Sequence, residues 1–231
     1  MKRSVKFKAR RLATIAASVL LIVSAFLCGC KQENELTRYV SELRCDIFSC
    51  ESEKYDISAA YGFKEEPFCN DGKVGTRVYR LSFTLKGAEA EAADRSIAMT
   101  YNGEEYKSAF NLNPLTGVLC AYMEIDGFSL KEFNAEIVTG AEKENVLFKS
   151  QLPDNTMTFS AALSSVEKNQ PTLIQNYRND DGEFTAEIYA RVIVKDNAAF
   201  WYIGFAEGND KLKAILVNGA TGEILAVREI V

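Results

Sequence analysis

Hydrophobic and polar side chains alternate along much of the chain between residues 55 and 149. In residues 78 to 85, Tyr79, Leu81, Phe83 and Leu85 alternate with polar residues, a period of two that is typical of strands burying one face. The pattern predicts further strands at residues 55 to 63, 95 to 101, 105 to 112, 117 to 125, 132 to 138 and 145 to 149. These short strands favour an antiparallel β-sandwich, and closure into a small barrel would give the same pattern.

A helical period replaces the alternation after Pro153. One stripe carries Ala162, Val166, Leu173, Ile174 and Tyr177, and it is interrupted by Pro171. Because proline removes a backbone hydrogen bond, we expect a kink or two short helices. Four strands should follow, at residues 183 to 195, 199 to 206, 212 to 218 and 223 to 230. The pattern predicts a helix laid across an antiparallel four-stranded meander.

Helical spacing also occurs near the start of this region, where Leu36, Tyr39, Val40 and Leu43 predict a short helix over residues 35 to 43. The predicted chain therefore has a tether and short helix at residues 30 to 54, a β-sandwich-like domain at 55 to 152, and a helix-on-sheet domain at 153 to 231. The fold class is α+β, mostly antiparallel β.

The first 29 residues have the pattern of an export signal. Six basic residues and no acidic ones precede an uncharged run from Leu12 to Leu27, as in a secretory signal. The run is close to the shortest length that spans a bilayer, so its length alone leaves an uncleaved membrane anchor open.

The end of this run, Leu27, Cys28, Gly29 and Cys30, resembles the lipobox of bacterial lipoproteins. The resemblance implies that a signal peptidase recognises Leu27, Cys28 and Gly29 and cuts before Cys30, whose thiol carries a diacylglycerol. Two acyl chains hold a protein stably at a membrane. The resemblance therefore implies a lipid-anchored protein on the extracytoplasmic face of the cell membrane.

Charge and composition exclude several functions. Removing a signal with six basic and no acidic residues changes the net charge from −5 to −11, so we exclude nucleic-acid binding. The chain has no histidine, which excludes Ser-His and Cys-His catalytic pairs and histidine metal sites. The acidic pairs lie beside turn signals, and residues 179 to 183 fit a hairpin turn better than a calcium loop. We predict no enzyme, no metal and no cofactor.

Four cysteines remain after Cys28 and Cys30 are assigned to the lipobox. Outside the cytoplasm they can form two disulfides. A bond from Cys45 to Cys50 requires the predicted helix to end between them, and Cys69 with Cys120 would be the second pair. Unpaired buried thiols fit the sequence equally well.

Residues 216 to 225, LVNGATGEIL, resemble the closing hairpin of PepSY and PepSY-like modules. The resemblance covers roughly residues 158 to 230 and matches Asn218, Thr221 and Gly222 as turn formers. Such modules are similar to the inhibitory segments of secreted peptidases. The resemblance therefore implies a non-catalytic protein that binds or restrains a cell-surface peptidase or another envelope protein.

Residues 200 to 205 are apolar on both faces of their predicted strand, and a helix covers only one face of a sheet. The other face must pack on the first domain or meet a partner or a ligand. As the interaction face we select Tyr189, Trp201, Ile203 and Phe205. The alternative function is a surface lipoprotein that binds a small molecule or glycan on its β domain, with Tyr101 and Tyr106 as platforms.

Overall fold

The computed structural model describes residues 34–230 except 51, 53, 68, 70, 71, 87–93, 209 and 210. The predicted signal and the lipobox residues Leu27, Cys28, Gly29 and Cys30 lie outside the described residues. Residues 35–231 form one compact unit. None of the helices in the described part of the chain is long and apolar enough to cross a membrane.

The described strands belong to one sheet in which nearly all neighbours are antiparallel, so the predicted α+β class with mainly antiparallel strands is confirmed. The strands are β1 (Val40–Cys50), β2 (Asp56–Glu66), β3 (Thr76–Lys86), β4 (Arg95–Tyr101), β5 (Glu104–Ala109), β6 (Asn111–Leu112), β7 (Leu119–Glu124), β8 (Glu132–Thr139), β9 (Glu142–Ser150), β10 (Glu187–Lys195), β11 (Ala198–Glu207), β12 (Lys211–Asn218) and β13 (Ile224–Ile230). The alternating segments predicted as strands all form strands in the structure.

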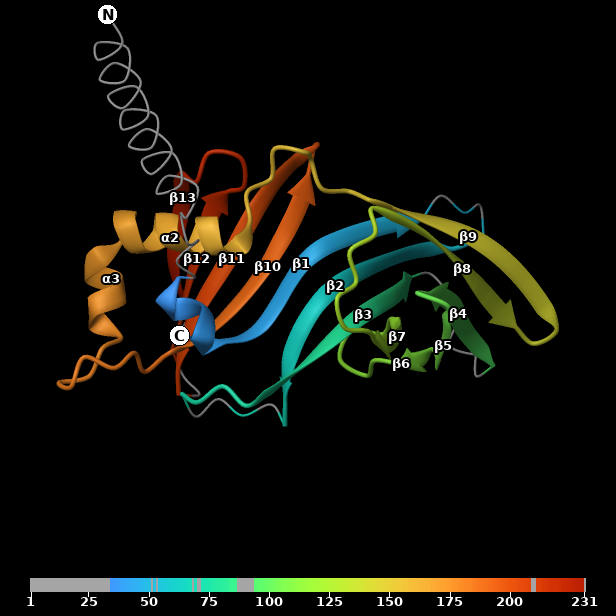
Figure 1. The fold of residues 1–231 in the computed structure, drawn as a ribbon, viewed down its shortest axis with the longest axis horizontal. Coiled ribbons are helices and arrows are strands. Elements are labelled where there is room, and N and C mark those ends of the chain that lie inside the picture. The colour runs from blue at the N-terminus through green and yellow to red at the C-terminus, as the bar shows by residue number, and fades with distance from the viewer. Residues whose placement is uncertain are drawn as a thin grey trace, which may run out of the picture. The chain divides into compact units, whose positions relative to one another are not determined.

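Strands β10 to β13 form an antiparallel meander whose front face is covered by two helices, α2 (Phe159–Asn169) and α3 (Pro171–Asn176) (Figure 1). Thr158 starts α2 because its hydroxyl accepts a hydrogen bond from the backbone N–H of Ala161. Pro171 occupies the first turn of α3, where a missing N–H costs nothing. The predicted division at this proline is confirmed.

The remaining strands close into a barrel instead of the predicted sandwich. Around the ring the order is β1, β2, β3, β7, β6, β5, β4, β8 and β9, with β9 pairing again with β1. The corner lies at Phe110, whose N–H still bonds to Arg95 of β4, while the next two residues pair with β7. One strand that changes partner therefore removes the free edges that a sandwich would keep.

Side chains fill the barrel. Phe133 and Phe148 stack with their ring centroids 4.8 Å apart, and Phe48 and Phe83 approach them edge-on. All four rings are at least 95% buried. A barrel of about eight strands is just wide enough for such packing, so its interior is a hydrophobic core and not a ligand chamber.

Residues 40 to 50 form a strand, and the predicted helix over residues 35 to 43 is wrong. Only Glu35–Tyr39 is helical, as a short 3₁₀ turn, before β1 begins. The register of β1 against β10 shifts between Val40 and Glu42. This irregularity places Val40 and Leu43 against buried partners on the same face although they are three positions apart. The bulge thus imitates the spacing of a helix.

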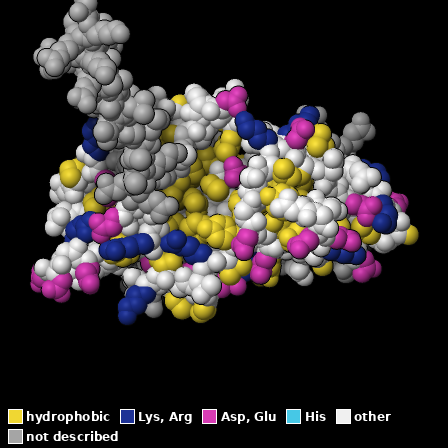
Figure 2. Space-filling model, in the orientation of Figure 1, with side chains coloured by type: hydrophobic (Ala, Val, Ile, Leu, Met, Phe, Trp, Pro, Cys, Tyr) yellow, Lys and Arg dark blue, Asp and Glu magenta, His cyan; other side chains and the backbone are white. Residues whose placement is uncertain are grey.

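β1 joins the two halves of the sheet. It runs parallel to β10 and antiparallel to β2, with Leu43 opposite both Ala190 and Phe63. Directly opposed residues point to the same face, so the barrel core and the core beneath the helices lie on one face of a continuous sheet. Figure 2 shows hydrophobic side chains over β10 and β1 on this front face.

Candidate interaction face

Three of the four residues selected as an interaction face are core residues. Trp201, Ile203 and Phe205 are 2%, 0% and 0% exposed, because alternate residues of β11 face the helices. The Trp201 ring packs on Phe159 of α2 at 5.6 Å, and its Nε1–H donates to the carbonyl of Met157 at 3.0 Å. The prediction that these three side chains dock a partner is wrong, since the protein's own helices cover them.

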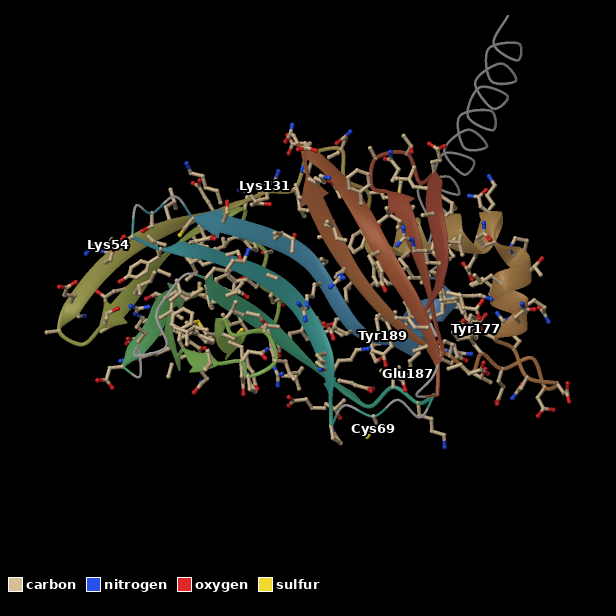
Figure 3. The ribbon with its side chains drawn as sticks, turned by 180° about the vertical axis from the view of Figure 1, so that it is seen from behind. Lys54, Cys69, Lys131, Tyr177, Glu187 and Tyr189 are labelled. Atoms are coloured by element: carbon tan, nitrogen blue, oxygen red, sulfur yellow. The ribbon has the colours of Figure 1, made fainter. Side chains whose placement is uncertain are left out.

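Tyr189 lies on the opposite side of the sheet from those residues, where its hydroxyl joins a buried polar cluster (Figure 3). The Tyr189 and Ser41 hydroxyls donate to Glu187 Oε2 at 3.0 and 2.9 Å, and the Gly72 N–H donates to Oε1 at 2.9 Å. Burial, and secondly the bond to Glu187, raise the pKa of Tyr189. The cluster fastens the segment between β2 and β3 over one end of β10.

Seen from behind, the sheet of β10 to β13 lies in front of its helices (Figure 3). Five apolar or aromatic residues of this rear face are only partly buried: Ile193, Phe200, Tyr202, Leu212 and Leu216. Of the first domain, the segment between β2 and β3 reaches only the end of this face at Glu187 and Tyr189, because the barrel continues the sheet sideways. We call these five residues the open face. The alternation in β11 also indicates this second apolar face, but the side that stays uncovered carries Phe200 and Tyr202 and not Trp201.

A groove of about 370 Å³ continues the open face across β1, β2, β3 and β7. Its floor holds the small residues Ala60, Gly62 and Ser82. Gly62 cannot carry a larger side chain, because an added Cβ would lie 1.7 Å from the carbonyl oxygen of Leu43. The groove therefore depends on a close approach of two strands. Its walls carry Glu42, Arg44, Lys64, Arg80, Asn113 and Tyr122.

The arginines of this groove are held by neighbouring groups. Arg44 pairs with Glu42 at 2.8 Å, while Arg80 pairs with Glu66 and lies 3.6 Å from Glu124. The guanidinium of Arg80 also lies 4.6 Å above the ring of Tyr122. Its Nε is buried without a hydrogen-bond acceptor. The groove thus presents oriented cations between aromatic and small side chains.

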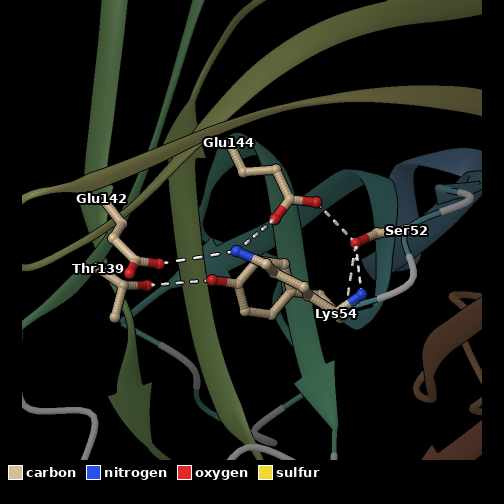
Figure 4. A network of polar contacts seen from close by, with 6 residues as sticks. Ser52, Lys54, Thr139, Glu142 and Glu144 are labelled. Atoms are coloured by element: carbon tan, nitrogen blue, oxygen red, sulfur yellow. Dashed lines mark hydrogen bonds and ion pairs between the residues drawn. The ribbon is translucent and has the colours of Figure 1, made fainter.

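A second group of polar side chains lies away from this groove. At the far end of the barrel, Ser52 donates to Glu144 at 2.9 Å and Lys54 lies 3.6 Å from Glu142 (Figure 4). These contacts tie the connection between β1 and β2 to the β8–β9 hairpin. Among the described residues, no three histidine, cysteine, aspartate or glutamate side chains are grouped as metal ligands.

The two predicted disulfides are absent, and all four cysteines of the described chain are free thiols. Cys45 and Cys50 lie in the same extended strand. They are five positions apart, which corresponds to about 16 Å between their Cα atoms. Cys120 is opposite Thr84, which pairs with Ser58 of β2, whereas Cys69 lies beyond the other end of β2. Both distances exceed the reach of a disulfide, so the alternative of unpaired thiols agrees with the structure.

These thiols should differ in reactivity. Burial raises the pKa of Cys45 to about 12 and that of Cys50 to about 11, whereas Cys69 is exposed. The thiolate is the nucleophile, so at pH 8 iodoacetamide should modify Cys69 roughly tenfold or more faster than Cys45 and Cys50, whose rates should rise with pH. Peptide mass spectrometry over time measures the rates. Equal rates in the folded protein would contradict this, and denaturant should remove the difference.

The predicted turns are confirmed. Asn218 Oδ1 accepts from the N–H groups of Ala220 and Thr221, and Gly222 has a φ of +76°. The segment from Asn179 to Glu183 is also a hydrogen-bonded turn.

The proposed tyrosine platforms differ in exposure. Tyr101 is 8% exposed and donates to the carbonyl of Gly127, so its use as a platform is wrong. Tyr106 is partly buried and donates to Glu104.

No protein-family model, curated protein or solved structure matches this chain.

Proposed function

We propose that the protein is a lipoprotein anchored through Cys30 on the extracytoplasmic face of the membrane, and that it acts as a non-catalytic protein-interaction module. The resemblance of residues 27 to 30 to a lipobox supports the anchor. The resemblance of residues 216 to 225 to a PepSY-like hairpin supports binding or restraint of a surface peptidase or another envelope protein.

The open face is the observation that carries the interaction. Ile193, Phe200, Tyr202, Leu212 and Leu216 lie on neighbouring strands of one sheet, and no described segment covers them. A contiguous apolar surface rimmed by polar groups is typical of a protein-binding site. The small-molecule alternative finds no chamber inside the barrel, because side chains fill it.

The anchor is tested by Cys30→Ala in cells fed a labelled fatty acid. The wild-type protein should incorporate the label and partition into detergent, while the variant should do neither and should keep its signal. A variant that is processed to the same mass and partitions equally would refute the anchor.

The interaction is tested with a photo-crosslinking amino acid placed at Tyr202 on the open face. Leu147, which is 39% exposed on β9, provides a matched control position. Crosslinking on intact cells should give a discrete protein adduct from position 202 and not from position 147. Absence of an adduct at 202, or the same adducts at both positions, would contradict docking through this face.

A further inference from the structure

The rear side of the sheet carries a row of arginines, although the net charge of the protein is negative. Arg191 and Arg44 are neighbours across the β10–β1 pairing, and Arg44, Gly62 and Arg80 continue the same row across β2 and β3. Like charges placed directly opposite each other are unfavourable in a sheet. A row of such charges in an acidic chain favours an anionic partner.

Among these arginines, Arg44 and Arg80 already pair with carboxylates of the protein, whereas Arg191 pairs with none in the described part of the chain. Within the described residues, no carboxylate forms an ion pair with Arg191, whose guanidinium lies 4.9 Å above the ring of Tyr202. Arg80 keeps one buried N–H without an acceptor. Between Arg44 and Arg80, Gly62 has no side chain, and the carbonyl oxygen of Leu43 occupies the position that a Cβ would take. The groove at Gly62 is therefore flanked by Arg44 on β1 and Arg80 on β3.

We propose that the groove around Gly62 receives acidic side chains from an extended segment of the partner protein. This inference rests on the proposed function, since it specifies the partner of the open face. Neighbouring strands are about 4.8 Å apart, so the row from Arg191 to Arg80 spans roughly 14 Å. An extended peptide covers that length in four or five residues, and alternate side chains about 6.7 Å apart point to the same side.

The groove favours such a peptide over a uniformly charged polymer. Glu42, Glu66 and Glu124 lie beside the arginines, so they repel anions that are displaced from the row. Tyr122 and Tyr202 border the row and offer their rings to uncharged side chains. Alternating acidic and neutral residues satisfy both conditions.

The test measures binding of a fluorescent capped pentapeptide with alternating glutamate and threonine to the mature lipoprotein in detergent. The glutamate peptide should bind about tenfold more tightly than its glutamine analogue at low salt, and salt should weaken it. Arg44→Gln should weaken binding about fivefold. Arg44 is 55% exposed at its side chain, so this variant should keep the wild-type unfolding midpoint. Lys131→Gln, at an exposed lysine outside the groove lining, should change affinity by less than twofold.

Three results would overturn the inference. The glutamine peptide could bind as well as the glutamate peptide, Lys131→Gln could weaken binding as much as Arg44→Gln, or inorganic phosphate and an anionic polysaccharide could bind at the groove while the peptide does not. Crosslinking at Tyr202 would still test the proposed function in each case, because it does not require an acidic partner.

Discussion

Replacing Trp201 by alanine is expected to destabilise the protein by about 3 to 5 kcal/mol, the usual cost of deleting a buried large aromatic ring. Trp201 is 2% exposed, packs on Phe159 and donates to the carbonyl of Met157. The variant loses the ring contacts between β11 and α2, and it leaves that carbonyl without its donor. Urea unfolding followed by circular dichroism measures the change in the free energy of unfolding, since Trp201 is the only tryptophan available for fluorescence.

Phe200→Ala is the matched control, because Phe200 precedes Trp201 but faces the uncovered side of the sheet. Because Phe200 is only partly buried, we expect its substitution to lower the free energy of unfolding by about 1 kcal/mol. If Trp201→Ala and Phe200→Ala destabilised the protein equally, the assignment of the two faces would be wrong. Phe200→Ala also separates folding from binding. If this variant folds but no longer binds the partner, the interaction lies on the open face.

Glu187→Ala is expected to lower the free energy of unfolding by roughly 3 kcal/mol. Glu187 is fully buried, and its carboxylate accepts hydrogen bonds from Ser41, Tyr189 and the Gly72 N–H. Removing the acceptor takes this partner from one buried and two partly buried donors, and a buried donor without an acceptor costs about 1 to 3 kcal/mol before the structure relaxes. The loss should appear in urea unfolding, and amide hydrogen exchange at Gly72 should become faster because its N–H loses its partner.

Glu187→Gln separates the hydrogen bonds from the packing. The amide oxygen still accepts from Gly72, while its NH₂ group requires the two hydroxyls to act as acceptors. We therefore expect a smaller cost, about 1 kcal/mol, with slow exchange at Gly72 retained. Equal destabilisation by alanine and glutamine, or unchanged exchange at Gly72 in Glu187→Ala, would show that this cluster does not hold the segment between β2 and β3.

Local patterns predicted most of the strands because one buried face produces a period of two in the sequence. Residues 95 to 101 form a strand with the predicted bounds, and Pro171 divides two helices as expected. The turn at Asn218 was also predictable, since it depends on a side chain bonding to its own backbone and on a glycine with positive φ.

Pairing between distant segments was not predictable from the same patterns. The alternation that identifies a strand does not identify its neighbour, so it fits a sandwich and a barrel equally. The barrel follows from Phe110, which bonds to β4 before its chain passes to β7. Similarly, the bulge after Val40 gave a helical spacing to residues that form a strand. The groove at Gly62 joins residues from four strands, and no local motif connects them.

The sequence by itself determined that the chain forms an acidic, β-rich body with a helical insertion, because hydrophobic period, charge and turn chemistry are local properties. It also indicated that β11 is apolar on both sides. Only the tertiary structure decided which side the helices cover, because this depends on how β1 joins β10 to β2. That single shared strand places both cores on one face of the sheet, and on the other side it leaves the open face and the row of arginines uncovered by any described segment.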